Sequence, residues 1–185
     1  IVTIEDSAEL KFDSHPNVVR LEARPASIEG TGEITIRSLV RNALRMRPDR
    51  IVVGEVRGEE CIDMLQAMNT GHDGSLSTGH SNSPKDMLSR IETMALSGAD
   101  LPLPAIRSQI AGALDIIVHL GRLRDRSRRV LEIVEVGEYR DGEIELFPLF
   151  SFEETGSDRD KVVGSLKPVG VLKNTQKLVA AGYQL

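Results

Sequence analysis

The chain has 185 residues and a formal net charge of −5, and this length suits one domain that buries about 70% of its unfolded surface. Its acidity and its few aromatic residues, four phenylalanines and two tyrosines, argue against a nucleic-acid-binding surface. The single cysteine, Cys61, argues against a disulfide framework and fits a reducing cytosol, and no apolar run approaches the roughly 18 residues of a membrane-spanning helix.

Strands and helices are expected to alternate in the first part of the chain. Short apolar runs predict strands, and apolar residues repeating every three to four positions predict helices. We expect strands over 1–4, 18–22, 51–56 and 75–78, and helices over 34–47, 59–69, 84–97 and 105–113. Pro48 closes the first helix, Pro84 opens the third, and Gly98 is expected to be the C-cap of the third.

The pattern changes after Asp115. We expect strands over 116–120, 130–139 and 143–152, then a polar loop over 153–161 and a short helix over 175–181. The last two strands are joined by a turn at residues 140–142. The whole pattern predicts an α/β fold, with a mainly parallel sheet and an antiparallel β-hairpin extension. We expect residues 1–152 to form this fold and residues 153–185 to form a C-terminal tail.

The segment RIVVGEVRG, residues 50–58, contains the first candidate site residue. Three apolar residues before Gly54 are typical of a buried parallel strand, and Glu55 follows where such a strand leaves the sheet. Ligands bind at this edge of open α/β sheets, and a carboxylate there can hold a metal-bound water. The alternative is a solvated glutamate that caps the next helix. Arg57 follows Glu55 by two positions and so shares its face of the strand.

Two other predicted strands also end in polar residues. The segment IVTIEDSAEL, residues 1–10, delivers Glu5 and Asp6 at a strand end. A third segment, residues 70–84, ends a strand with His80 and small polar residues, which can sense or bond a phosphate. If these strands are neighbours in a parallel sheet, their polar ends meet at one edge.

Together these segments resemble the secretion ATPase superfamily of type II and type IV systems, and most closely its CpaF/TadA branch, the tight-adherence pilus ATPases. IVTIED-AEL resembles the Asp box of that family, and TGHDGSLSTGHSNSP resembles its His box. RPDRIVVGEVRG resembles its Walker B motif, with glutamate in place of the commoner aspartate. The likeness continues through LVRNALRMRPDR and DMLSRIETMALSG to the C-terminal LVAAGYQL, so it covers roughly the whole chain.

The resemblance implies a RecA-like P-loop NTPase core that uses ATP and Mg²⁺. It implies a hexameric ring at the cytoplasmic face of the inner membrane, which powers pilus assembly or protein export together with secretion platform proteins. In that family's terms Glu5 orients the attacking water, Glu55 holds Mg²⁺ through water, and His80 senses the γ-phosphate. Further residues expected around the nucleotide are Asp6, Glu9 and Arg57.

One motif of the family is missing from these residues. The phosphate loop has the pattern Gly-x-x-x-x-Gly-Lys-Ser/Thr, but no lysine in this chain follows a glycine. Gly30 and Gly32 are flanked by Glu29 and Glu33, whose charges repel phosphate, and are expected to form an ordinary loop. In the family the phosphate loop lies just upstream of the Asp box. We therefore expect it to precede Ile1, and we expect this C-terminal part of the ATPase domain to be inactive alone.

Three alternatives stay open at this point. The first is a stand-alone, non-catalytic pseudo-ATPase that binds partners in a secretion platform. The second is a nucleic-acid motor with the same core, against which the acidity and the few aromatic residues count. The third is a zinc site formed by His72, Asp73 and His80, but these residues lie on a turn and at the far end of the following strand.

Two groups of arginines also need an explanation. Arg37, Arg41 and Arg45 line one face of a predicted helix, either as a solvated stripe or as a contribution to a neighbouring subunit's site. The second group has only Asp125 to offset it, which predicts a solvated loop or contact with a partner's acid or with anionic lipid headgroups. Its members are Arg122, Arg124, Arg126, Arg128 and Arg129.

Overall fold

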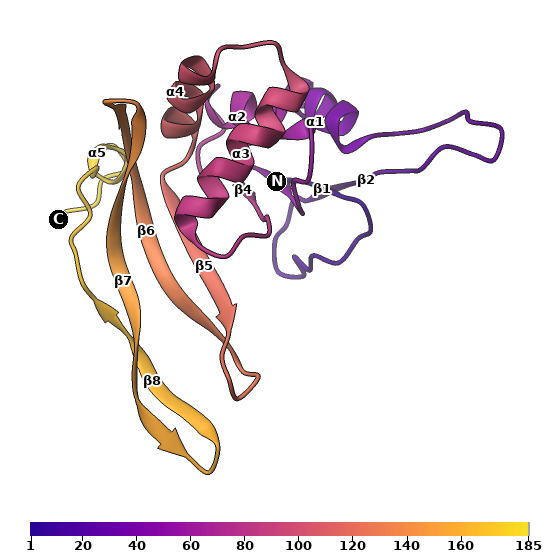
Figure 1. Ribbon diagram of the computed structural model, residues 1–185. Coiled ribbons are helices and arrows are strands. Elements are labelled where there is room, and N and C mark those ends of the chain that lie inside the picture. The colour runs from indigo at the N-terminus through magenta and orange to yellow at the C-terminus, as the bar shows by residue number, and fades with distance from the viewer. Residues whose placement is uncertain (185) are drawn as a thin grey trace. The chain divides into compact units, whose positions relative to one another are not determined.

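The computed structural model describes residues 1–184 and divides the chain into two compact units. Unit 1 comprises Ile1–Asn82 and Asp86–Ala113, and unit 2 comprises Ser83–Lys85 and the chain from Leu114 onwards. Unit 1 contains a four-stranded parallel sheet, and unit 2 contains a four-stranded antiparallel sheet (Figure 1). The predicted α/β class with an antiparallel extension is therefore confirmed.

The parallel sheet of unit 1 has the strand order β2-β1-β3-β4. Its strands are β1 (Val2–Glu5), β2 (Val19–Glu22), β3 (Ile51–Val53) and β4 (Leu76–Ser77), so β3 and β4 are shorter than predicted. Every residue of β1 and β3 is buried, as expected for central strands covered on both faces. The largest fully buried apolar side chains of unit 1 are Ile4, Val40, Ile51, Val53, Cys61, Ile62, Leu65, Ile106 and Ile110.

Helix α1 (Ile36–Arg45) illustrates how local sequence sets an element's limits. Its N-cap Thr35 accepts a hydrogen bond on its side-chain oxygen from the Ser38 N–H at 3.1 Å, which satisfies one of the free donors of the first turn. The helix ends at its C-cap, Met46, within the predicted range. The buried residues of this helix recur at helical spacing and are Leu39, Val40 and Ala43.

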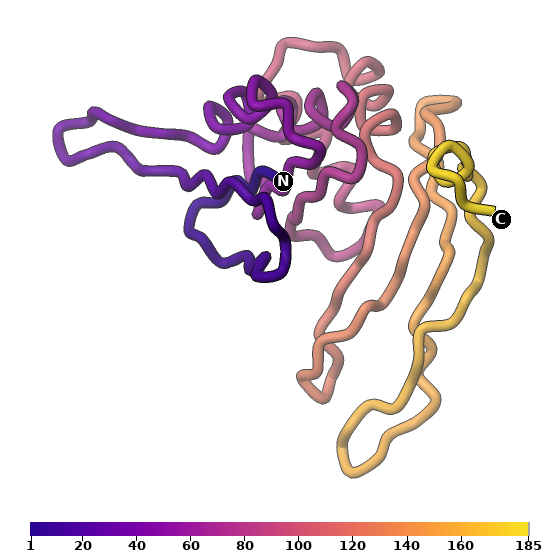
Figure 2. The backbone as a smooth tube through the Cα atoms, turned by 180° about the vertical axis from the view of Figure 1, so that it is seen from behind, coloured from indigo at the N-terminus to yellow at the C-terminus, as the bar shows by residue number. Residues whose placement is uncertain are grey.

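Two long loops flank β2 in unit 1, over residues 6–18 and 23–35 (Figure 2). In the second loop, Arg24 and Ile34 form an isolated antiparallel bridge. Gly30 and Gly32 have φ values of +75° and +76°, so these glycines form turns. The interpretation of this glycine pair as an ordinary loop is confirmed.

The other helices of unit 1 are α2 (Glu60–Met68), α3 (Pro84–Gly98) and α4 (Leu103–Ala113). The predicted C-cap role of Gly98 is wrong, because this glycine is the last helical residue and is not left-handed. A Cβ atom at Gly98 would lie only 2.4 Å from the main-chain oxygen of Glu59. Gly98 is therefore required by the close approach of α3 to the start of α2.

Unit 2 is an antiparallel sheet in the order β5-β6-β7-β8. Its strands are β5 (Ile116–Arg122), β6 (Arg128–Arg140), β7 (Glu143–Asp158) and β8 (Lys161–Pro168). The predicted polar loop over 153–161 is wrong, because β7 continues to Asp158 and pairs with β8, a strand that was not predicted. The polar residues of this stretch contribute through main-chain hydrogen bonds, which apolar patterning does not reveal.

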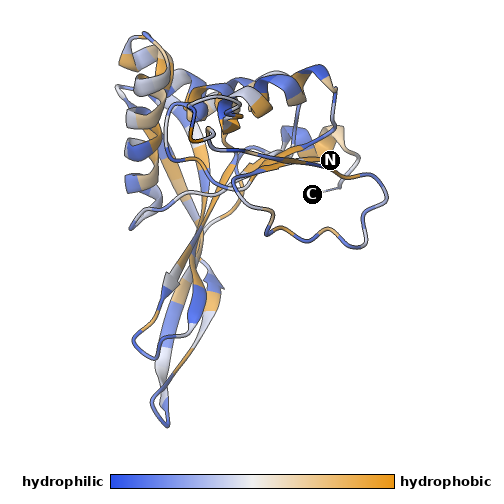
Figure 3. Ribbon diagram, turned by 90° about the vertical axis from the view of Figure 1, so that its right-hand side faces the viewer, coloured by the Kyte–Doolittle hydropathy of each residue, from blue (hydrophilic) through white to orange (hydrophobic). Residues whose placement is uncertain are grey.

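The predicted division of the chain after residue 152 falls inside β7, so it does not coincide with the division between the two units. Hydrophobic and hydrophilic residues mix along the strands of unit 2 (Figure 3), and the buried apolar side chains of these strands are Val134, Val136, Leu149 and Val162.

A buried carboxylate anchors the C-terminal segment to the sheet of unit 2. Glu135 is only 3% exposed, and its two oxygens accept hydrogen bonds from the main-chain N–H groups of Lys173 and Asn174 at 2.8 and 2.6 Å. The segment continues into the short helix α5 (Gln176–Ala180), which matches the predicted terminal helix. None of the helices within residues 1–184 is both long and apolar enough to cross a membrane.

Candidate functional site

The carboxyl edge of the parallel sheet brings together the three segments that end in polar residues. Beyond the strands themselves, the N–H of Gly54 donates to the oxygen of Ile4 at 2.8 Å, and the N–H of Val56 donates to the oxygen of Thr78 at 3.0 Å. The hydroxyl of Thr78 also donates to the oxygen of Gly54 at 2.6 Å. The ends of β1, β3 and β4 therefore lie next to one another, as the parallel order predicts.

Glu55 lies at the centre of the contacts at this edge. One oxygen of its carboxylate, Oε2, accepts hydrogen bonds from Arg57 Nε at 2.7 Å and contacts Arg57 Nη2 at 2.6 Å. The other oxygen, Oε1, lies 3.0 Å from His80 Nε2. The Glu55 side chain is 18% exposed, whereas that of His80 is 87% exposed. A half-buried carboxylate is thus linked to an imidazole that reaches solvent.

Positive neighbours keep this carboxylate ionised. The hydrogen bond from Arg57 holds the pKa of Glu55 below its ordinary value, against the opposing effect of burial, and the charges of Arg57, His80 and Arg90 add to the lowering. The same hydrogen bond raises the pKa of Arg57. Arg57 Nη1 also lies 3.6 Å from Asp6 Oδ2, so the chain of charges extends to the residue after β1.

The carboxylate of Glu55 has room for one more hydrogen bond. A carboxylate offers about four acceptor positions, of which Arg57 occupies two and His80 one. Mg²⁺ prefers oxygen ligands and keeps several of its waters in protein sites. The chemistry of Glu55 therefore fits an indirect contact to Mg²⁺, through a metal-bound water on Oε1.

Glu5 lies at the same edge but has a different immediate role. It is 5% exposed, and its Oε1 accepts hydrogen bonds from the N–H groups of Glu9 and Leu10, both at 3.0 Å. A Cβ atom at Gly54 would lie 3.0 Å from Glu5 Cγ, so Gly54 allows the two strand ends to pack closely. Glu5 thus anchors the loop after β1, and its Oε2 accepts no hydrogen bond within residues 1–184.

The predicted site residues therefore divide into two groups. Asp6, Glu55, Arg57 and His80 form one connected set of charges. Glu5 and Glu9 form the second group, in which the main-chain N–H of the exposed Glu9 donates to the Glu5 carboxylate. Sequence reasoning missed Glu60, whose Oε1 accepts from the N–H groups of residues 57 and 58 at 2.6 and 2.9 Å. The sequence feature that could have identified it is its position as an acidic residue in the first turn of α2, where carboxylates accept from free main-chain N–H groups.

Two of the three arginines of α1 form ion pairs with α2. Arg37 Nε and Arg41 Nε each donate to the buried carboxylate of Asp63 in α2, at 2.7 Å. Arg37 also bonds Glu59 Oε2 at 2.6 Å and the main-chain oxygen of Gly98 at 2.9 Å. Arg37 joins α1 to α2 and α3 and its side chain is 22% exposed, so the expectation of a solvated stripe is wrong for this residue. The Arg41 side chain stays 58% exposed beside its ion pair, and Arg45 is exposed as expected.

Known proteins are similar to this chain in sequence and in fold. The profile of the type II/IV secretion system protein family matches residues 1–169. A Mycobacterium tuberculosis protein named "Putative conjugal transfer protein" is 52% identical over 134 residues, which are 72% of this chain and 37% of that protein. The type IV secretion system protein PtlH of Bordetella pertussis is 37% identical over 147 residues, 77% of this chain and 42% of PtlH.

Among solved structures, the VirB11 ATPase of the Brucella suis type IV secretion system superposes with a TM-score of 0.64 at 32% identity, over 72% of this chain and 39% of that one. The chain thus spans about two fifths of the length of the relatives that it matches. The chain belongs to the type II/IV secretion system protein family and has the RecA-like α/β fold of its ATPases.

Proposed function

We propose that the chain is part of an ATP-hydrolysing motor of the CpaF/TadA branch, which powers tight-adherence pilus assembly or protein export. The supporting observation is the 3.0 Å contact between Glu55 and His80, which joins the predicted Walker B and His box segments. The relatives that are named as secretion and transfer proteins support a role in such a system. Hydrolysis, a hexameric ring, and partners in the inner-membrane platform at its cytoplasmic face are proposed for a longer protein that carries a phosphate loop.

Each residue at the edge has a distinct proposed role. Mg²⁺ bound together with ATP would supply neutralisation of the charge on the γ-phosphate. Glu55 would hold it indirectly, by accepting a hydrogen bond from a metal-bound water, and Arg57 keeps this carboxylate ionised and oriented. His80 extends into solvent from Glu55 and contacts the terminal phosphate. Glu5 orients the attacking water with Oε2, the oxygen that does not hold the loop.

The test is Glu55→Gln in a polypeptide extended to include the phosphate loop. Glutamine keeps the shape but lacks the charge that orients the magnesium-bound water, so the hydrolysis rate falls about 10–100-fold. ATP binding is retained, because the phosphate loop supplies most of the contacts to the nucleotide. Both quantities are measured on one preparation, by phosphate release and by calorimetry with magnesium-ATP.

Glu29→Gln is the matched control, since it removes the same charge from an exposed loop of unit 1. A Glu55→Gln protein that hydrolyses ATP at the parent rate would contradict the assignment of Glu55. If the extended parent neither binds nor hydrolyses ATP, the alternative holds, and the chain is a non-catalytic module of a secretion platform.

A further inference from the structure

Unit 2 carries a cluster of cations that the proposed ATPase chemistry does not use. We define the basic tip as five arginines of the β5–β6 hairpin together with the first residue of β8: Arg122, Arg124, Arg126, Arg128, Arg129 and Lys161. The β5–β6 and β7–β8 turns lie at the same end of unit 2, opposite the β6–β7 turn (Figure 1). The chain as a whole is acidic, with a net charge of −5, so this end differs in sign from the whole molecule.

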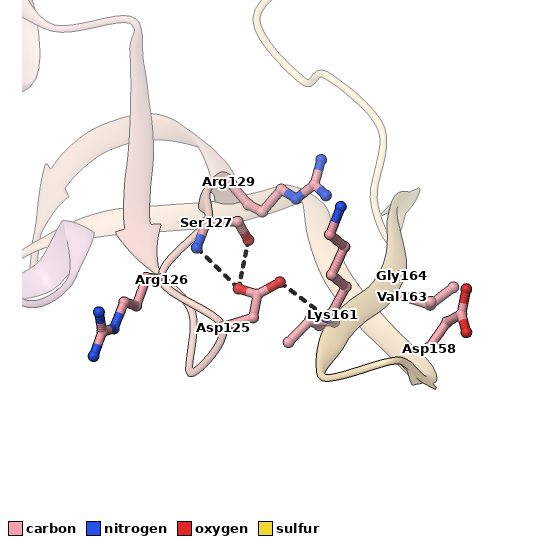
Figure 4. A pocket seen from close by; sticks show the side chains of 9 residues that line it. Asp125, Arg126, Ser127, Arg129, Asp158, Lys161, Val163 and Gly164 are labelled. Carbon is pink, nitrogen blue, oxygen red and sulfur yellow. Dashed lines mark hydrogen bonds between the residues drawn. The ribbon is translucent and has the colours of Figure 1, made fainter.

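Most of these cations have no carboxylate partner. Arg124 pairs with Glu154, but Arg126, Arg128, Arg129 and Lys161 make no ion pair within residues 1–184. Three of the tip's cations line a pocket of about 650 Å³ between the two turns. In Figure 4 the ends of Arg129 and Lys161 extend to one side of this pocket, and Arg126 extends to the other.

Two acids line the pocket, Asp125 and Asp158, and Asp125 is engaged by hydrogen bonds. Asp125 Oδ1 accepts from the N–H and the hydroxyl of Ser127, at 2.9 and 2.7 Å, and Oδ2 accepts from the N–H of Val162 at 2.9 Å. These hydrogen bonds, that of the Ser127 hydroxyl first, lower the pKa of Asp125 to about 2. Asp125 therefore links the β5–β6 turn to β8 through hydrogen bonds that occupy both of its carboxylate oxygens.

The arrangement has local energetic costs. Arg122 and Arg128 are directly opposed across β5 and β6, and like charges in such a pair destabilise a sheet. Arg126, Arg159 and Asp160 have φ values of 66°, 45° and 67°, in turns where glycine and asparagine are preferred. Strained backbone and a like-charge pair gathered at one place are a reason to look for a function there.

We propose that the basic tip docks on a membrane surface and binds the phosphates of anionic lipid headgroups. Arginine favours phosphate, because its planar guanidinium donates two parallel hydrogen bonds. Leu120 and Val163, next to the cations, are 63% and 46% exposed, as suits an apolar layer below the headgroups. No aromatic residue occurs in 120–130 or 157–164, so the tip offers no platform for stacking bases.

The test is co-sedimentation of the 185-residue chain with lipid vesicles. Vesicles containing phosphatidylglycerol bind the chain, vesicles of phosphatidylcholine alone do not, and added salt weakens binding. The double variant Arg128→Gln/Arg129→Gln binds about 25-fold more weakly, since each arginine near an anionic surface contributes about fivefold. Arg128→Gln also relieves the repulsion with Arg122, and thermal unfolding of the double variant checks that it is folded.

The control is Arg20→Gln/Arg45→Gln, which removes two exposed arginines from unit 1 and binds vesicles as the parent does. The proposal is overturned if the basic-tip variant matches the parent, if the control loses as much, or if neutral vesicles bind equally well. It is also overturned if inorganic phosphate at constant ionic strength releases the chain, which would indicate a small-anion site. Tighter binding to duplex DNA or polyglutamate than to the vesicles would overturn it in favour of a different macromolecule.

Discussion

Replacing Glu5 tests whether this buried carboxylate anchors the loop that follows β1. One oxygen of Glu5 accepts two main-chain hydrogen bonds, from Glu9 and Leu10, each 3.0 Å long. Glu5→Gln keeps the Cγ atom that packs against Gly54 and keeps one acceptor oxygen, but it removes the charge. Glu5→Ala removes the acceptor altogether and leaves both N–H groups to water.

The expected loss of stability follows from these two bonds. A hydrogen bond to a charged group contributes about 1.5–3 kcal/mol and a neutral one about 0.5–1.5 kcal/mol, so Glu5→Gln costs about 1 kcal/mol per bond, or about 2 kcal/mol in all. Losing both charged bonds in Glu5→Ala costs about 3–6 kcal/mol. In a chain of this size, Tm falls by about 2–4 °C for each kcal/mol, so Glu5→Gln lowers Tm by about 4–8 °C.

Thermal unfolding followed by circular dichroism measures the fall in Tm, and amide hydrogen exchange measures the anchoring directly. Exchange at the Glu9 and Leu10 amides accelerates in both Glu5 variants, because their acceptor is weakened or lost. Glu9→Gln is the matched control, since its exposed side chain carries the same charge and its Tm stays near that of the parent. If Glu5→Gln has the same Tm as the parent chain and both amides exchange as slowly as before, the anchoring argument is refuted.

Two further predictions concern packing and acid stability. Gly98→Ala places a methyl group against the main-chain oxygen of Glu59, so overpacking of about 1–3 kcal/mol outweighs the helix-propensity gain of about 1 kcal/mol, and Tm falls; a rise in Tm would show that α3 does not approach α2 so closely. The pKa of Asp125 is lowered from 3.8 to about 2 in the folded chain, so its stabilising effect is complete above pH 3.8 and is lost as pH falls through about 2. Asp125→Asn therefore has a lower Tm than the parent chain at neutral pH, and this difference in Tm shrinks as the pH falls from 3.8 to about 2. A difference in Tm that is independent of pH would contradict the assignment of a hydrogen-bonded carboxylate.

The candidate site could be predicted because its charged residues come at strand ends. β1 and β3 are buried along their whole length, and the charged residues of both segments, Glu5 and Glu55, come at the end of a strand or just after it. In a parallel sheet those ends meet at one edge, which brings Glu55 and His80 within 3.0 Å although they are far apart in sequence. The sequence also predicted the helix α1, since its apolar spacing is a local feature, but the predicted range of 34–47 extends two residues beyond the helix at each end.

What could not be predicted depends on partners distant in sequence. The arginines of α1 repeat every four residues, as on a solvated face, but Asp63 in α2 pairs with Arg37 and Arg41. β8 was missed because its partner stretch in β7 is polar on both faces, so the pairing depends on main-chain hydrogen bonds. In the same way, the two hydrogen bonds that Glu135 accepts from the C-terminal segment span 38 and 39 residues.

The same distinction explains why Glu5 and Glu55 differ although both follow buried strands. After β1 the chain turns back, and its N–H groups at residues 9 and 10 reach Glu5, so this carboxylate is drawn inward and is 5% exposed. After β3 the chain runs on to Glu60, which takes up the free N–H groups of residues 57 and 58 instead. Glu55 is thereby left with side-chain partners only, Arg57 and His80, and stays 18% exposed. The loop that follows each strand therefore decides which carboxylate anchors the main chain and which can face a ligand.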